Sequence, residues 1–437
     1  MTFPRYPRYK DSGVVWLGEV PAHWEVLPLK SRFRVVGGST PTAEEEHWGG
    51  QVTWVTPGDL SALPSLDVDA SARQITDKGL ASCGATLVPP RSLILSTRAP
   101  IGSLAIASVP LCTNQGCKSL IPQKGIESRF FAYLLGNSTE ALNVRGKGTT
   151  FLELSGDELA SFKVSVPPPD EQMIVARFLD HETGKIDALI EEQRRLIELL
   201  KEKRQAVISH AVTKGLDPNV PMKDSGVEWL GEVPAHWFVG KLKWHALVYS
   251  GTDGKADTGD IPLYGANGII GFSDGLSYSS PKVLIGRVGS SGAVNFASRK
   301  FSVSDNALVV DETRTIDVGY LHFWAKTQDF SIEVSTTAQP LLTASQVKNF
   351  RLPLPQPNEQ REIAAFLDRE TGRIDALIGE VEQAISLMGE RRSALISAAV
   401  TGKIDVRGWS AGSETQYPEL AMVAEESAGY SAQGGVA

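Results

Sequence analysis

The cysteines and histidines are the residues whose chemistry could support metal binding or catalysis. The chain has seven histidines and three cysteines, Cys83, Cys112 and Cys117, and neither type forms a short-spaced cluster. Zinc sites and disulfide scaffolds need further thiols or imidazoles at close spacing. We therefore expect no metal site. His23 and His236 recur in a repeated segment, and we expect them to be structural.

Motifs that place a nucleophile, a phosphate or a cofactor are absent from the sequence. Each Gly-Lys pair is followed by neither Ser nor Thr, so there is no P-loop. G-x-S-x-G, H-E-x-x-H and G-x-G-x-x-G do not occur, nor does the Asn/Asp-Pro-Pro-Tyr/Phe motif associated with adenine methyltransferases. The sequence therefore predicts no catalytic residues.

Two pairs of segments repeat along the chain. Residues 10–24 recur at 223–237 with one difference, Val15 against Glu228, and residues 171–190 resemble residues 359–378. The two offsets are 213 and 188, so the intervening segment is 25 residues shorter in the second copy. This pattern predicts a duplicated unit in which constrained segments frame variable ones.

Apolar residues at alternating spacings of four and three follow the second repeat in each copy. Such a seam is typical of a coiled coil, and antiparallel pairing is expected because a parallel pair would force the second variable segment to span more than its own width. Asp170 and Asn358 are predicted N-caps, and Gly215 and Gly402 are predicted ends. The seam residues expected to pair the helices or bind partners are Ile186, Ile190, Ile197, Leu200 and Val207, and Ile374, Ile378, Ile385, Met388 and Leu395.

Arg204 and Arg392 interrupt the two seams at equivalent positions. They are expected either to pair with carboxylates or to extend outward at a partner's surface.

The predicted organisation has five parts. Mixed α/β domains occupy residues 1–166 and 216–355, with short strands near 52–56, 92–96 and 283–286, and long helices occupy 167–215 and 356–403. Residues 404–437 form an acidic tail that we expect to be disordered. This tail carries half of the net charge of −8, so the first domain is nearly neutral and is compatible with a local basic face.

Composition excludes other broad classes. The hydrophobic content of 42% argues against wholesale disorder, and no apolar run approaches the ~18 residues that a membrane span needs. The N-terminus lacks the apolar core of a signal peptide, and the odd number of cysteines fits a reducing compartment. We expect a cytoplasmic protein.

The whole arrangement resembles the specificity subunit of type I restriction–modification systems. The resemblance is carried by the two copies of Lys-Asp-Ser-Gly-Val-x-Trp-Leu-Gly-Glu-Val-Pro-Ala-His-Trp, by the proline-rich helix entries 166–172 and 354–360, and by the helix ends 211–215 and 399–403. Segments resembling recurrent parts of target recognition domains are residues 93–102, 112–116, 264–268, 285–289 and 304–307.

The resemblance implies a non-catalytic, DNA-binding subunit that acts in defence against foreign DNA. Two α/β target recognition domains, related by a pseudo-two-fold axis, would each read one half of a bipartite, asymmetric site in double-stranded DNA. The paired helices would set the spacer and dock two modification subunits that methylate adenine at N6, and restriction subunits would join them. S-adenosylmethionine, ATP and magnesium would belong to those partners, with no cofactor on this chain.

Base edges are read by side chains that donate or accept hydrogen bonds from ordered loops. Within the segments that carry the resemblance, the candidates in the first domain are Arg98, Asn114 and Gln115, with Lys147 and Thr149 as phosphate contacts. In the second domain they are Tyr264, Asn267, Arg287, Asp305 and Asn306. Each could instead stabilise a turn. Two alternatives for the chain remain open: an enzyme with an unrecognised site, and a scaffold whose paired helices bind only protein, which would lack a basic groove on the inserts.

Overall fold

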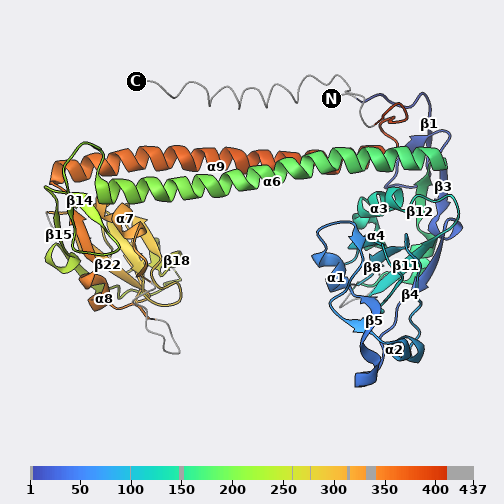
Figure 1. Cartoon of the computed structure of the whole chain (residues 1–437), viewed down its shortest axis with the longest axis horizontal. Helices are drawn as coiled ribbons and strands as arrows, with labels where there is room; N and C mark the ends of the chain where they lie inside the picture. Colours follow the sequence, from blue (N-terminus) through green and yellow to red (C-terminus); the bar gives the residue numbers. More distant parts are fainter. Residues whose placement is uncertain are drawn as a thin grey trace. The chain divides into compact units, whose positions relative to one another are not determined.

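The computed structural model describes residues 3–98, 100–146, 152–257, 259–275, 277–312, 315–330 and 341–410. The chain divides into two compact units, drawn in Figure 1: unit 1 comprises Met1–Glu191 and Ile385–Ala437, and unit 2 comprises Glu192–Ala384. Each unit therefore contains one α/β domain and part of each long helix. The predicted boundaries at 166 and 215 follow a different criterion, because they lie next to the ends of the first long helix, Pro169–Lys214.

A five-stranded sheet forms the centre of unit 1. Its strand order is β4-β11-β8-β9-β6, and all neighbours are antiparallel except β9 and β6. Every residue of β8 is buried, as expected for a strand covered on both faces. The strands are β4 (Phe33–Gly37), β11 (Cys117–Pro122), β8 (Leu93–Ser96), β9 (Leu104–Ala107) and β6 (Asp67–Val68).

Three smaller sheets complete unit 1. One is three-stranded, with order β10-β5-β7, and the others are the pairs β12-β3 and β1-β2. Their strands are β10 (Leu111–Thr113), β5 (Trp48–Val55), β7 (Gln74–Ile75), β12 (Lys163–Val166), β3 (Glu25–Pro28), β1 (Tyr9–Asp11) and β2 (Glu19–Pro21).

The helix α3 (Ser128–Gly136) lies between the central sheet and the long helix α6 (Pro169–Lys214), as Figure 1 shows. Its aromatic residues Phe130 and Phe131 are fully buried in the main core of unit 1, together with Phe178 of α6. The shorter helices of the unit are α1 (Pro57–Ala62), α2 (Asp77–Ser82), α4 (Thr139–Arg145) and α5 (Gly156–Ser161).

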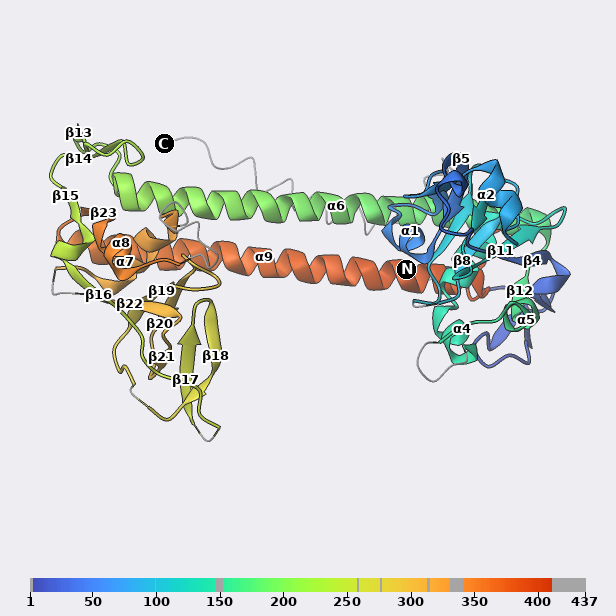
Figure 2. The ribbon, with the colours of Figure 1, turned by 90° about the horizontal axis from the view of Figure 1, so that it is seen from below.

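Among the described residues, unit 2 repeats the connectivity of unit 1 except that its central sheet has no counterpart of β6. Its central sheet has the order β16-β22-β19-β20, beside a three-stranded sheet β18-β17-β21 and the pairs β15-β23 and β13-β14 (Figure 2). The strands are β16 (Ala246–Ser250), β22 (Ala307–Glu312), β19 (Lys282–Gly286), β20 (Val294–Ala297), β18 (Gly268–Ser273), β17 (Ile261–Gly265), β21 (Ser302–Val303), β15 (Phe238–Lys241), β23 (Arg351–Leu354), β13 (Met222–Asp224) and β14 (Glu232–Pro234). The helices are α7 (Val318–Lys326) and α8 (Ala344–Asn349). The predicted duplicated α/β fold is confirmed.

The long helices α6 and α9 (Pro357–Val400) run antiparallel within each unit, as predicted. In unit 1 the start of α6 shares a core with the end of α9, through Leu179 and Val400. In unit 2 the end of α6 shares a core with the start of α9, through Val212 and Ile363.

The predicted N-caps Asp170 and Asn358 are wrong by two residues, because the helices begin at Pro169 and Pro357 and the capping positions are therefore Pro168 and Gln356. Proline is favoured in the first turn since its missing N–H needs no partner there. The predicted terminal glycines are confirmed: Gly215 and Gly402 have φ angles of +78° and +73° just beyond the helix ends.

Residues 404–410, which the sequence assigns to the tail, pack on unit 1. Val406 is buried, Asp405 N donates to Pro4 O at 2.8 Å, and the ring of Trp409 lies 5.8 Å from that of Phe178. Burial of these apolar side chains extends the ordered part beyond the predicted boundary, and the rest of the predicted tail, 411–437, lies outside the described residues. In the part of the chain that is described, no helix is both long and apolar enough to cross a bilayer.

Candidate nucleic-acid interface

The repeated segment of unit 1 binds a carboxylate at the start of α6. Glu171 accepts hydrogen bonds from Trp24 Nε1 at 3.0 Å and from the Tyr6 hydroxyl, and His23 Nε2 lies 2.8 Å from its second oxygen. Burial raises the pKa of Tyr6, which keeps its hydroxyl protonated as a donor. Trp24 also packs on Gly402 beyond α9, where any Cβ would meet the indole and Pro21. This cluster joins one end of each helix to the α/β domain.

Unit 2 contains the equivalent cluster. Trp237 Nε1 donates to Glu359 at 3.0 Å, His236 Nε2 lies 2.9 Å from the same carboxylate, and Trp237 packs on Gly215. His23 and His236 therefore hold helix ends in place, as the sequence analysis expected of structural residues. The carboxylate in unit 2 is less buried than Glu171, with 28% of its side chain exposed against 6%.

Three candidates of the first domain lie together where β8 ends and β10 turns into β11. The backbone N–H of Thr97 donates to Gly116 O at 2.8 Å, which brings Arg98 beside Asn114 and Gln115. Arg98 pairs with Glu153 at 2.8 Å, and the Asn114 side chain accepts from Gly116 N at 2.9 Å. Gln115 is exposed, and its side-chain oxygen accepts a hydrogen bond from the Thr40 hydroxyl. Lys147 and Thr149 lie outside the described residues.

Three loops of the second domain converge in the same way. Arg287 N donates to Asn306 O at 2.8 Å, and its guanidinium donates to Asp305 O at 3.0 Å. The loop at Ala266 approaches from another side. Gly286 permits this contact, because a Cβ there would fall 2.7 Å from Ala266 O. Among the candidates, Asn267, Asp305 and Asn306 are exposed, whereas Arg287 and Tyr264 are half-buried.

The side chains of the second set differ in what they can offer a ligand. The ring of Tyr264 packs against Phe301 at 5.7 Å. The Arg287 guanidinium already donates a hydrogen bond to the neighbouring loop. Asp305 and Asn306 project between β21 and β22 and offer a carboxylate and an amide, the groups that recognise cytosine and adenine edges.

All ten seam residues of the long helices are shielded from solvent. Ile186, Ile197 and Ile374 are buried and the others are half-buried. By contrast, five leucines on other faces of these helices are exposed: Leu189 and Leu387 in unit 1, and Leu196, Leu199 and Leu377 in unit 2. Four of them form two pairs related by the 188-residue repeat, Leu189 with Leu377 and Leu199 with Leu387, so exposed leucines occur at equivalent positions in both units.

The seam arginines pair with carboxylates of the opposite helix. Arg392 lies 2.7 Å from Asp187 in unit 1, and Arg204 lies 2.9 Å from Asp375 in unit 2. Of the two predicted alternatives, the structure supports the carboxylate pairs.

Sequence reasoning missed a cluster of two tryptophans and an arginine in the three-stranded sheet of unit 1. The rings of Trp48 and Trp54 meet edge to face at 5.0 Å, and the Arg73 guanidinium lies 3.6 Å above the centroid of Trp48. The predicted strand 52–56 included Trp54, but it left out Trp48, and nothing in the sequence links either residue to Arg73.

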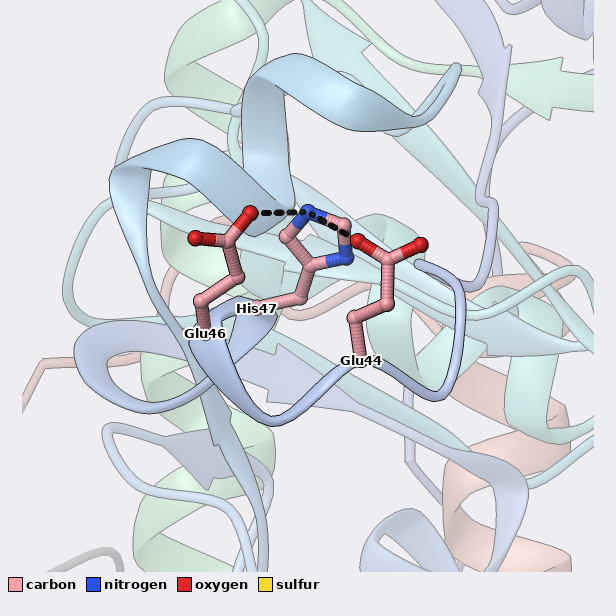
Figure 3. Close-up of side chains that lie close together, drawn as sticks. All are labelled: Glu44, Glu46 and His47. Atoms are coloured by element: carbon pink, nitrogen blue, oxygen red, sulfur yellow. Dashed lines mark ion pairs between the residues drawn. The ribbon is translucent and has the colours of Figure 1, made fainter.

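One group of potential metal donors occurs among the described residues. Figure 3 shows Glu44, Glu46 and His47, whose donor atoms lie within 4.8 Å of one another. Glu46 already pairs with Lys78 at 2.9 Å, and His47 Nδ1 bonds the Thr42 hydroxyl at 2.8 Å. The cluster therefore has partners of its own and we assign no ion to it. Burial raises the pKa of both Cys112 and Cys117 to about 12, so these thiols are protonated core residues.

Comparison with known proteins places this duplicated arrangement in context. The model of a family described as the type I restriction modification DNA specificity domain matches residues 21–199 and 249–386. The specificity subunit of the type I restriction enzyme MjaIX from Methanocaldococcus jannaschii is 27% identical over 427 residues, covering 89% of this chain and 95% of the relative. The specificity subunit of the Escherichia coli enzyme EcoprrI is 25% identical over 359 residues, covering 79% and 87%.

Solved structures share the fold. A chain from work on complex assembly and conformational transition of the type I R-M system has a TM-score of 0.67 at 16% identity, covering 87% of this chain and 98% of its own. The HsdS subunit from Thermoanaerobacter tengcongensis has a TM-score of 0.53 at 15% identity, covering 88% and 98%.

Proposed function

The chain belongs to the type I restriction modification DNA specificity family, and we propose that it is the non-catalytic specificity subunit of such a system. Each α/β domain reads one half of a bipartite DNA site. The observation that carries this proposal is the duplication itself: two domains of the same connectivity, apart from β6, each gather polar side chains at converging loops. Two related readers joined in one chain suit a split, asymmetric site.

In the first domain, Gln115 is the best-placed of the candidate base contacts. Its exposed amide can donate to a base edge while Thr40 holds its oxygen. Arg98 forms an ion pair with Glu153, so it contacts DNA only if that ion pair opens. Asn114 acts through the turn that presents Gln115, and Lys147 and Thr149 stay proposed phosphate contacts.

In the second domain, Asn267, Asp305 and Asn306 are the proposed base contacts. Arg287 orients the loop that carries Asp305 and Asn306, because it bonds two carbonyl oxygens of that loop. Tyr264 lies on β17 just before the turn that carries Asn267, and its ring contact with Phe301 supports that strand.

The paired helices set the spacer and bind partner proteins. The ten shielded seam residues hold the pair together, and the exposed leucines offer two equivalent apolar surfaces to two modification subunits. Restriction subunits join this assembly. S-adenosylmethionine, ATP and magnesium are bound by those partners, and the complex acts on foreign DNA in the cytoplasm.

The test is to co-express the chain with its cognate modification subunits and to map methylated adenines by sequencing. A bipartite motif with a fixed gap is expected. Exchanging residues 25–166 for those of a relative moves the paired strands β3 and β12 together, and it should alter one half of the motif only.

The matched exchange of residues 238–354 carries β15 and β23 together and should alter the other half. If either exchange changed both halves, the assignment of one reader to each half-site would be wrong. Methylation without any sequence motif would instead favour a scaffold that binds only protein. Methyl transfer by the isolated chain would favour an enzyme.

A further inference from the structure

The tryptophan pair in the first domain is tied to the same loop that holds Gln115. Trp54 Nε1 donates to Ser39 O and Trp48 Nε1 donates to Thr42 O, both at 2.9 Å. Between these anchors, the Thr40 hydroxyl donates to Gln115. The loop 39–42 is therefore hydrogen-bonded both to Gln115 and to the two indoles.

Arg73 is held on this pair by its side chain and by its backbone. Its guanidinium stacks on Trp48 at 3.6 Å and lies 5.9 Å from Trp54. Its carbonyl accepts from the Ser71 hydroxyl at 2.7 Å, and that hydroxyl oxygen also accepts from Trp54 N at 3.0 Å. An exposed arginine is thus ordered before any ligand arrives.

Among the described residues, Arg73 differs from most arginines of the first domain in having no carboxylate partner. Five other arginines of the first domain pair with carboxylates, namely Arg32, Arg91, Arg98, Arg129 and Arg145. For Arg73, the described residues provide no carboxylate within ion-pair distance. A stacked guanidinium keeps its in-plane N–H groups available, and their planar fork matches a phosphate.

We propose that Arg73, stacked on Trp48, binds a DNA phosphate beside the half-site that the first domain reads. This inference rests on the proposed function. A phosphate fits better than a base, because the loop 39–42 separates Arg73 from Gln115 and a fixed charge at that position serves to orient the domain on the duplex.

The test uses the complex with its modification subunits and two duplexes, one carrying the mapped site and one of equal length without it. Arg73→Gln should weaken binding to both duplexes about tenfold near 100 mM salt. The slope of log affinity against log salt should fall by about one. Arg73→Lys should keep that slope, because it keeps the charge, and should bind with intermediate affinity.

Lys78→Gln is the matched control, since it removes one charge from the same sheet region but from a residue already paired with Glu46. It should change affinity by less than about twofold. Unchanged affinity and slope in Arg73→Gln would overturn the proposal, and so would lost discrimination at one base pair with an unchanged slope. If the parent complex bound both duplexes equally, the proposed function would fail instead, a result that the Arg73 variants do not influence.

Discussion

Arg392 and Asp187 form a two-pronged ion pair across the helices of unit 1, with Nε–Oδ1 and Nη2–Oδ2 distances of 2.7 and 3.1 Å. Arg204 and Asp375, which are the same two residues of the other copy, pair at 2.9 Å in unit 2. In both units, the arginine of one long helix therefore pairs with the aspartate of the other. These two pairs fix the register of the antiparallel helices.

Reversing one of these pairs tests the register. Arg392→Asp and Asp187→Arg should each destabilise unit 1 by about 1 kcal/mol, because each puts like charges together in a half-exposed pair. The double variant should recover most of that loss. Denaturant unfolding of the two single variants and the double variant gives the coupling energy. Additive losses would contradict the pairing.

Removing the buried carboxylate of unit 1 should cost more than removing its equivalent in unit 2. Glu171→Ala leaves the Trp24 and Tyr6 donors without their acceptor, at about 2–4 kcal/mol. Glu359→Ala affects a more exposed site and should cost about 1–2 kcal/mol. Hydrogen exchange at each helix end measures both effects, and Glu171→Gln, which keeps an acceptor oxygen, is the control. Equal losses would show that burial does not govern this site.

Lengthening both helices by one heptad tests their role in spacing. Seven residues inserted after Glu191 and seven after Ser386 keep the seam in register and leave both tryptophan clusters intact. The added ~10 Å corresponds to about three base-pair steps. Methylation mapping should show the same half-sites with a gap longer by about three base pairs. Modification should be slower, because the longer gap also rotates one half-site about the duplex axis by about 100° relative to the other. A heptad in one helix alone should disrupt pairing. An unchanged gap at full activity would rule out the helices as the spacer.

His322 should make unit 2 sensitive to mild acid. Burial lowers its pKa to about 4, and the nearby charges of Lys326 and Arg204 act in the same direction. The folded pKa lies below the ordinary value, so the unfolded chain takes up the proton first and stability falls as pH drops from about 6.5 toward 4. At pH 5 the expected loss is about 2 kcal/mol.

The matched variant is His322→Ala, because Ala132 occupies the equivalent place five residues after the N-cap of α3. Denaturant unfolding at pH 7.5 and pH 5 should show a smaller acid loss in the variant than in the parent. The same loss in both would assign the acid sensitivity to other groups.

Periodic features of this protein were predictable from its sequence. The repeats at offsets of 213 and 188, the heptad seam and the terminal glycines each depend on residues close together in the chain. Local propensity and helix periodicity therefore specify the duplicated domains and the long helices. Burial of the seam follows from the same periodicity, since one face of each helix is mostly apolar and is interrupted at equivalent positions by Arg204 and Arg392. The helices begin at Pro169 and Pro357, before the predicted caps Asp170 and Asn358, because proline is favoured in the first turn while Asp and Asn are favoured as caps.

Side chains far apart in sequence were brought together by tertiary structure alone. Glu171 meets Trp24 across 147 residues, and Gln115 meets Thr40 across 75. Neither pair has a sequence periodicity, because the contacts depend on how sheets and helices pack. The stacking of Arg73 on Trp48 and the burial of Val406 are of the same kind. The sequence determined which segments repeat and which faces are apolar. Packing decided which polar groups are paired, and so which remain available to a ligand.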